Sequence, residues 1–310
     1  MNLRSRTRKV IAVKVIAIRV IAVALVLLSI LVVAVLLRVT GMHRIRHEQV
    51  KVRSRGAELA ATISLPRWGS GPFPAVVTVH GSGPRRAQDS RIVWRNLVPE
   101  GVVVLTYDKP GVGESTGRFE EVRTDTSEQQ LRGVAEDVLA CLEVLRKHPQ
   151  VDPKRVGLFG GSQAGWIIPL AGDVQKDIPF SVILSGPATS YGMEMYYSSL
   201  TGEGQGLGSG LSADEIEERL NTYNGLTGYE PLPVLARSTT RTLWLFGERD
   251  IDIPARRSAT ILRELQGQGA PFTIKVYPNG NHNLVDYATG TELDFWPDIV
   301  DWLREQQILK

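Results

Sequence analysis

Short apolar runs alternate with amphipathic segments along most of the chain from residue 74 onward. Such runs, several of them rich in β-branched side chains, are typical of strands buried inside a sheet. Between two of the runs, residues 128–148 carry apolar side chains at helical spacing, which predicts a helix covering one sheet face. Strands that alternate with helices form a mostly parallel sheet with helices on both faces, so the pattern predicts an α/β fold. The predicted elements are an edge hairpin at 50–65, strands at 74–79, 102–107, 155–159, 180–186, 241–246 and 272–277, and helices at 128–148, 256–265 and 294–306.

One long connection, at about residues 187–240, interrupts this alternation. A connection of this length is functional or carries structure of its own. It contains the Gly-rich run 202–210, followed by Ser212 and Glu215, which are spaced as a capping box that starts a helix. We therefore expect a small lid insertion at about 187–240.

The second strong hydrophobic feature is an apolar run at residues 20–37, broken only by Ser29. As a helix rising about 1.5 Å per residue, this run spans roughly the apolar core of a bilayer. It is long for a signal peptide, and no small-x-small cleavage site follows it. The sequence thus predicts a basic tail at 1–19, a single-pass transmembrane anchor at 20–37, a juxtamembrane linker at 38–49 and a globular domain at 50–310.

The charge of the chain is divided unevenly between its two ends. Residues 1–55 carry twelve Lys or Arg and one acid, which gives +11, so residues 56–310 carry −8 of the total charge of +3. The basic residues therefore indicate attraction to a lipid bilayer and not to nucleic acid. Six basic residues lie on each side of the apolar run and leave its orientation open. A globular domain that follows an uncleaved anchor favours an extracytoplasmic location.

The candidate chemistry begins at Gly160–Gly165, between a buried strand and an apolar helix start. A serine at such a turn is held in a strained conformation that lifts its hydroxyl away from the sheet. The geometry needs small residues two positions to either side, which Gly160 and Ala164 provide, although the usual G-x-S-x-G pattern has glycine where Ala164 stands. This predicts Ser162 as a nucleophile; the alternative is a Gly-Ser turn without chemistry.

A nucleophilic serine needs a base, and the base needs an orienting acid. In one class of hydrolases these groups follow the serine as acid and then histidine, at the ends of successive strands. Here Asp250 and Asp252 follow the strand at 241–246, and His282 follows the strand at 272–277. We prefer Asp250 as the acid because it lies closer to the strand end. In the alternative interpretation, the aspartates cap the next helix and His282 is an ordinary turn residue.

The charge that develops on an acyl oxygen must be stabilised by backbone N–H groups. The strand at 74–79 runs into the Gly-rich loop His80–Pro84, which we expect to turn an N–H group towards Ser162. The predicted donors of this oxyanion hole are the N–H groups of Ser82 and Gln163, with Gly81 as the nearest alternative to Ser82. An ordinary strand-to-helix turn is the competing interpretation of this loop.

Other cofactor signals are absent from the sequence. Gly111-Val112-Gly113 follows a strand, but Gly117 is one residue too late for a dinucleotide-binding G-x-G-x-x-G motif, and no P-loop is present. No His or Cys cluster has the sequence spacing of metal ligands, so neither a metal nor a cofactor is expected. Cys141 is the single cysteine and excludes an intrachain disulfide.

Taken together, the chain from about residue 50 onward resembles the bacterial α/β-hydrolase-fold serine hydrolases related to dienelactone hydrolases and serine aminopeptidases. The resemblance implies an α/β-hydrolase fold, a triad of Ser162, His282 and Asp250, and a covalent acyl-enzyme. The chain departs from the family pattern at Ala164 and at Lys109, where arginine is commoner. The matching segments are His80–Pro84, Tyr107–Gly117, Asp152–Gly157, the Ser162 turn, Ser185–Ala188, Gly247–Pro254 and His282.

These observations predict a membrane-anchored serine esterase that acts on a small acyl substrate. One alternative is an aminopeptidase-like amidase, in which acids such as Glu194 or Glu203 bind the substrate amine. A second alternative is a membrane-tethered binding module on a catalytically dead scaffold, against which an intact triad argues. A cluster of aromatic and Met side chains in the insertion either lines an acyl pocket or packs the lid onto the core: Tyr191, Met193, Met195, Tyr196 and Tyr197.

Overall fold

The structure is a computed structural model in which the chain divides into two compact units, residues 1–45 and 46–310. The part of the chain that it describes consists of residues 19, 21–33, 45–202 and 210–310.

In the first unit, residues 21–33 form a helix whose apolar side chains are exposed. Across the described residues, no helix combines the length and the apolar character needed to cross a membrane. Residues 1–18, 20 and 34–44 lie outside the described residues, and they include nearly all of the predicted tail, both ends of the predicted anchor and much of the predicted linker. The anchor at 20–37 therefore stays a prediction.

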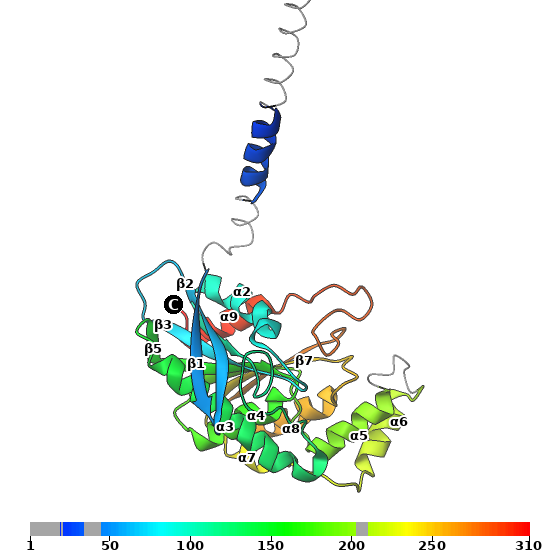
Figure 1. The fold of residues 1–310 in the computed structure, drawn as a ribbon. Coiled ribbons are helices and arrows are strands. Elements are labelled where there is room, and N and C mark those ends of the chain that lie inside the picture. The colour runs from blue at the N-terminus through cyan, green and yellow to red at the C-terminus, as the bar shows by residue number, and fades with distance from the viewer. Residues whose placement is uncertain (1–18, 20, 34–44, 203–209) are drawn as a thin grey trace, which may run out of the picture. The chain divides into compact units, whose positions relative to one another are not determined.

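The second unit is built around an eight-stranded sheet in the order β1-β2-β4-β3-β5-β6-β7-β8 (Figure 1). Strand β2 runs antiparallel to β4, whereas every pair from β4–β3 to β7–β8 is parallel. The predicted, mostly parallel sheet is therefore confirmed. The strands are β1 (Ile45–Ser54), β2 (Ala57–Pro66), β3 (Phe73–Val79), β4 (Val103–Tyr107), β5 (Val151–Gly161), β6 (Phe180–Leu184), β7 (Arg241–Gly247) and β8 (Phe272–Tyr277).

Helices cover both faces of this sheet. Figure 1 shows α2 and α9 on one face and α3, α4 and α8 on the other. The helices of the second unit, with short 3-10 turns marked η, are η2 (Ala87–Ser90), α2 (Arg91–Leu97), η3 (Val98–Glu100), η4 (Thr124–Thr126), α3 (Ser127–Arg146), α4 (Ala164–Val174), α5 (Tyr191–Thr201), α6 (Ala213–Asn221), α7 (Leu232–Ala236), α8 (Ala255–Gly267) and α9 (Trp296–Glu305).

The core lies between the central strands and these helices. Every residue of β3 and β4 is buried, as expected for strands covered on both faces. Helix α3 buries the predicted stripe, including Leu131, Val138 and Leu145. Cys141 on the same helix is fully buried, and burial raises the pKa of its thiol far above the usual range.

The edge hairpin is longer than predicted, because β1 begins at Ile45 and not at residue 50. Many side chains of β1 are exposed, so the strand shows no continuous apolar run in the sequence. Arg55 and Gly56 both have positive φ, at 44° and 79°, which suits a two-residue hairpin turn. Arg55 and Ser54 hold the turn on α3 by hydrogen bonds to the buried carboxylate of Asp137, at 2.9 Å from Arg55 Nε and 2.6 Å from Ser54 Oγ.

Within its described residues, the insertion between β6 and β7 carries three helices, α5, α6 and α7. Helix α6 begins as predicted, with the Glu215 N–H donating to Ser212 Oγ at 3.2 Å and the Ser212 N–H donating to Glu215 Oε2 at 2.8 Å. Helix α5, which the sequence analysis did not predict, begins at an N-cap in which Ser190 Oγ accepts a hydrogen bond from the Met193 N–H. Residues 203–209 of the Gly-rich run lie outside the described residues.

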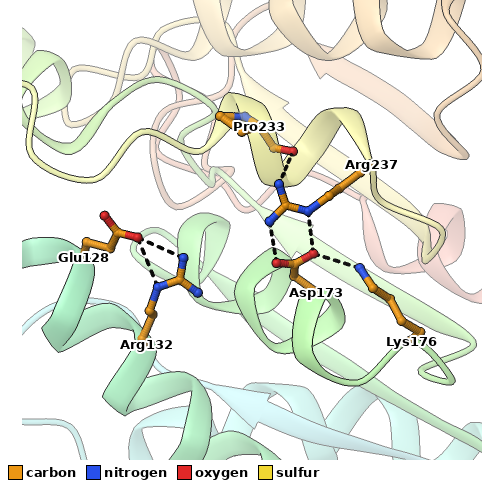
Figure 2. Close-up of polar contacts among 6 residues, drawn as sticks. All are labelled: Glu128, Arg132, Asp173, Lys176, Pro233 and Arg237. Carbon is orange, nitrogen blue, oxygen red and sulfur yellow. Dashed lines mark hydrogen bonds and ion pairs between the residues drawn. The ribbon is translucent and has the colours of Figure 1, made fainter.

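The end of the insertion is fastened to α4 by charged side chains (Figure 2). Arg237 donates two hydrogen bonds to Asp173, at 2.8 and 2.6 Å, and a third to the Pro233 carbonyl at 2.9 Å. Lys176 Nζ also lies 2.8 Å from Asp173 Oδ1. The hydrogen bonds from Arg237, together with the contact with Lys176, lower the pKa of Asp173 well below its usual range. The carboxylate thus holds the segment after α7 against the end of α4.

Candidate active site

Ser162 occupies the turn between β5 and α4 with φ at +57°, a backbone conformation that residues other than glycine rarely adopt. Its N–H donates to the Leu184 carbonyl at 2.9 Å, which fixes the turn on the neighbouring strand. A Cβ atom at Gly160 would lie 2.5 Å from the Cβ atom of Ala164 and 2.6 Å from the Val79 carbonyl oxygen. The strand and helix therefore approach so closely that only a glycine fits at position 160 beside Ala164.

His282 and Asp250 are joined by a hydrogen bond of 2.8 Å between Nδ1 and Oδ2. The Asp250 side chain is fully buried, and 16% of the His282 side chain is exposed. The other carboxylate oxygen of Asp250 accepts the N–H groups of Asp252 and Ile253 at 2.8 and 3.0 Å. Asp252 Oδ2 lies farther from the imidazole, at 3.7 Å from Nδ1. Asp250 is therefore fixed by three N–H groups, one of which belongs to His282.

The electrostatics of His282 follow from these neighbours. Burial alone lowers the pKa of the imidazole, because a desolvated cation is disfavoured. The hydrogen bond that the imidazole donates to Asp250 and the charge of Asp250, with smaller contributions from Asp252 and Glu194, raise the pKa by more than burial lowers it. The net result is a pKa above the ordinary value of 6.5.

Two side chains of α5 hold the loop that carries Asp250 in place. Tyr197 donates its hydroxyl hydrogen to the Asp250 carbonyl at 2.6 Å, and Thr201 Oγ1 donates to the Ile251 carbonyl at 2.5 Å. In the sequence, Tyr197 belongs to an aromatic cluster, and nothing in the pattern indicates this role. The partner lies 53 residues away along the chain, so no local pattern could have identified the contact.

Ser162 and His282 line one pocket of about 900 Å³, at the carboxyl ends of the strands. In the part of the chain that the structure describes, Ser162 Oγ makes no hydrogen bond, and none joins it to His282. Four residues of α5 line the same pocket, namely Tyr191, Glu194, Met195 and Ser198. Of the aromatic and Met cluster, Tyr191 and Met195 thus face this pocket. The charged lining is mainly acidic, with Asp89, Glu121, Glu194, Asp252 and Glu292 against Arg85.

The predicted oxyanion donors come from two segments that border Ser162. Ser82 lines the pocket, and a Cβ atom at the adjacent Gly81 would lie 3.3 Å from Ser162 Cβ. Gln163 is buried at the start of α4. Among the described residues, the N–H groups of Ser82 and Gln163 donate to no other group. They are therefore available to a ligand, and the roles of Ser82 and Gln163 stay predictions.

Asp250, Asp252 and His282 also form a cluster that could hold a metal ion, since each offers a ligand atom within 4.8 Å of the others. The sequence analysis found no cluster with metal-ligand spacing, because these residues are brought together only by the fold. Both oxygens of Asp250 already accept N–H hydrogen bonds, as described above. These hydrogen bonds explain why the three side chains lie together: the Asp250 carboxylate holds the His282 imidazole.

The Gly-Val-Gly loop after β4 packs around the carboxylate of Asp108. Asp108 accepts hydrogen bonds from the Ala87 N–H at 2.7 Å and the Glu114 N–H at 2.9 Å. A Cβ atom at Gly113 would lie 2.1 Å from Asp108 Oδ2, so the loop closes tightly over this carboxylate. Asp108 therefore connects the loop to the segment that follows the predicted oxyanion loop.

Comparison with known proteins relates the chain to a peptidase family and to an esterase. A family model described as the prolyl oligopeptidase family matches residues 90–307, more than half of the chain. Esterase EstD of Thermotoga maritima is 27% identical over 256 residues, covering 73% of this chain and 58% of the relative. Dipeptidyl-peptidase 5 of Porphyromonas gingivalis is 26% identical over 219 residues, covering 68% of this chain and 30% of the relative. The chain therefore matches little more than half of one relative and under a third of the other.

Among solved structures, the esterase Pf2001 of Pyrococcus furiosus superposes with a TM-score of 0.61 at 14% identity. The match covers 84% of this chain and 90% of that chain. At this identity the likeness concerns the fold alone, and it confirms the predicted α/β-hydrolase fold.

Proposed function

This chain belongs to the prolyl oligopeptidase family and has the α/β-hydrolase fold, and from this premise we propose that it is a serine hydrolase that cleaves the ester bond of a small acyl substrate. The observation that carries the proposal is the strained Ser162 in the same pocket as an imidazole bound to buried Asp250. The esterase among the relatives supports ester cleavage.

In the proposed reaction, Ser162 Oγ attacks the acyl carbonyl carbon while His282 Nε2 takes the hydroxyl proton. Asp250 holds the proton on Nδ1, which leaves Nε2 as the acceptor, and its charge stabilises the imidazolium that forms. The carbonyl oxygen becomes an oxyanion that accepts hydrogen bonds from the N–H groups of Ser82 and Gln163. A Ser162–His282 hydrogen bond is expected to form when substrate binds, because such contacts are often loose in ligand-free enzymes.

The tetrahedral intermediate then expels the alcohol, which receives the proton from His282, and leaves an acyl group on Ser162. A water molecule, deprotonated by His282, attacks the acyl carbon, and the acid is released as the proton returns to Ser162. Each cycle therefore consumes one ester and one water and produces one acid and one alcohol.

A membrane location forms part of the proposal. The apolar run at 20–37 and the surrounding basic residues support a single-pass anchor that attracts anionic lipid. The hydrolase unit would then act close to the bilayer, on the extracytoplasmic side.

An aminopeptidase-like amidase is the second candidate. Glu194 lines the pocket and acts electrostatically on His282, which favours a substrate carrying an ammonium group. The dipeptidyl-peptidase among the relatives supports the same alternative. Glu203, the other acid considered in the sequence analysis, lies outside the described residues.

The deciding experiment is covalent labelling of the full chain in mild detergent by a fluorophosphonate, beside the Ser162→Ala variant. We expect labelling that disappears in the variant. Hydrolysis of p-nitrophenyl acetate and of an aminoacyl p-nitroanilide then separates the esterase from the amidase. A folded wild-type protein that neither reacts with the probe nor cleaves either substrate would favour the binding-module alternative.

A further inference from the structure

Lys109 lies two residues after the end of β4 and is almost completely buried, with 5% of the residue exposed. Its ammonium group donates to the Gly81 carbonyl at 2.6 Å and to the Gly83 carbonyl at 3.0 Å. It also lies 5.7 Å from the centre of the Phe119 ring. Because Gly81 and Gly83 flank Ser82, one cation holds the predicted oxyanion loop on both sides of its donor.

The geometry of the peptide bond gives this contact a consequence for Ser82. In a planar trans peptide, the carbonyl of one residue and the N–H of the next point in opposite directions. The Gly81 carbonyl and the Ser82 N–H belong to the same peptide unit. When Lys109 holds the carbonyl, the Ser82 N–H must therefore point away from the ammonium group. Ser82 itself lines the pocket that contains Ser162.

We propose that Lys109 is a positioning residue that aims the Ser82 N–H at the oxyanion by holding the Gly81 carbonyl. This inference rests on the proposed function, because it assigns a support to the oxyanion hole of that reaction. Lys109 acts through the loop and does not contact the substrate carbonyl.

The other polar contacts of the loop hold different peptide units from the one that carries the predicted donor. Arg85 Nε donates to the Ser82 carbonyl at 2.8 Å, and that carbonyl shares its peptide unit with Gly83, not with the predicted donor. The Lys109 N–H donates to the Arg85 carbonyl at 3.0 Å, which ties the two segments together. Among the described contacts of the Gly81 carbonyl, the Lys109 ammonium is the hydrogen-bond donor.

Burial of a lysine is costly, so its presence here needs a compensating role. Burial is the main cause that lowers the pKa of Lys109; the charge of Glu121 raises this pKa and the charge of Arg85 lowers it. The net pKa is about 8. The group is therefore mainly charged at pH 7, where its hydrogen bonds are of the stronger, charge-assisted kind.

The test compares Lys109→Met with Lys109→Arg in the full chain, using kcat and KM for p-nitrophenyl acetate and the melting temperature. Loss of one oxyanion donor typically costs about 10²–10³ in kcat, so a misdirected donor should cost about 10–10². We expect this loss in kcat for Lys109→Met, with KM changed less than about threefold. Lys109→Arg, which restores a cation, should recover most of the kcat. The matched control is Lys176→Met at the exposed Lys176, which should leave kcat and KM at the wild-type values.

A double substitution separates positioning from a general loss of structure. Ser82→Pro removes the N–H that Lys109 is proposed to aim. In that background, Lys109→Met should lower kcat by less than about threefold, because no donor remains to misdirect. Full additivity of the two losses would overturn the proposal. If the double variant does not fold, the recovery of kcat by Lys109→Arg decides: a loss in kcat that arginine does not restore would also overturn it.

Failure of this inference is distinguishable from failure of the proposed function. A wild-type protein that hydrolyses esters and labels at Ser162, with Lys109→Met as active as Lys176→Met, would overturn the role of Lys109 alone. A wild-type protein without labelling or hydrolysis would overturn both.

Discussion

At the scale of single residues, the two aspartates beside His282 occupy different environments although they are two positions apart. Asp250 is fully buried and both of its oxygens accept N–H hydrogen bonds, whereas 30% of the Asp252 side chain is exposed. A carboxylate fixed in this way can hold the imidazole in one orientation and one tautomer. Asp252 acts on the ring mainly through its charge.

Exchange of each aspartate for asparagine should therefore have unequal effects. Asp250→Asn offers an amide to Nδ1 and disturbs the tautomer, so we expect kcat to fall by about 10²–10⁴. Asp252→Asn should change kcat by less than about threefold, because its contact is longer. Ester hydrolysis by the two variants, with melting temperatures as a check on folding, measures the difference. Equal losses would contradict the choice of Asp250.

The raised pKa of His282 predicts the pH dependence of the reaction. The imidazole must be neutral to accept the serine proton, so kcat/KM should fall as the pH decreases through a pKa above 6.5. Glu194→Gln removes one of the charges that raise this pKa and should move the acidic limb to lower pH. Glu292→Gln, in the same pocket but not among the groups that shift His282, is the control and should leave the limb in place. A Glu194→Gln profile identical to the wild type would argue against this electrostatic account.

The sequence was sufficient to predict the chain order of Ser162, Asp250 and His282, because each follows a recognisable apolar strand. It did not predict the contact of Tyr197 with the Asp250 carbonyl or the contact of Lys109 with the predicted oxyanion loop. Tyr197 acts on a carbonyl 53 residues away, and Lys109 acts on one 28 residues away. Such contacts depend on which loops lie side by side in the fold. No hydrophobic periodicity or motif spacing in the sequence indicates them.

At the scale of elements, the prediction succeeded for the central strands, which are buried on both faces, and failed at the start of β1 and at α5. The central strands β3 and β4 appear as continuous apolar runs, whereas the first residues of β1 alternate irregularly. Helix α5 was missed because its residues mix aromatic, Met and small polar side chains without a clear helical stripe. The Ser212–Glu215 capping box, by contrast, predicted the start of α6 from four residues.

The charged contacts that fasten the insertion to α4 should contribute measurably to stability. Asp173→Asn weakens a two-bond contact with Arg237 and a contact with Lys176, for which we expect a loss of about 1–2 kcal/mol. For a domain of this size, that corresponds to a fall of roughly 2–8 °C in melting temperature. Arg132→Met breaks the exposed Glu128–Arg132 pair on α3 and is the control, with an expected change below about 0.5 kcal/mol (Figure 2). Equal shifts in melting temperature for the two variants would show that the Asp173 contacts contribute no more to stability than the exposed Glu128–Arg132 pair.

At the scale of the whole molecule, charge and hydrophobicity separate the chain into two parts. The first 55 residues carry +11 and the apolar run, and the remainder carries −8. The compact unit that begins near residue 46 contains the sheet, the pocket and every candidate catalytic residue. The family and the fold concern this unit.

This division predicts how the protein distributes between membrane and water. We expect the full chain to sediment with membranes after an alkaline carbonate wash, because an anchor held by apolar contacts resists it. A chain of residues 45–310 should remain in the supernatant and keep its ester hydrolysis. Immunoblotting of both fractions, with activity measured in each, gives the result. Release of the full chain by carbonate would contradict the anchor at 20–37.

The burial of Cys141 has a practical consequence for spectroscopy. It is the only cysteine, and its inaccessible, highly basic thiol gives maleimide dyes no target on the folded protein. A cysteine introduced in place of Met195, which is 46% exposed at the pocket, would therefore carry a single fluorophore without removal of the native thiol. Its emission would report the arrival and departure of each acyl substrate in real time.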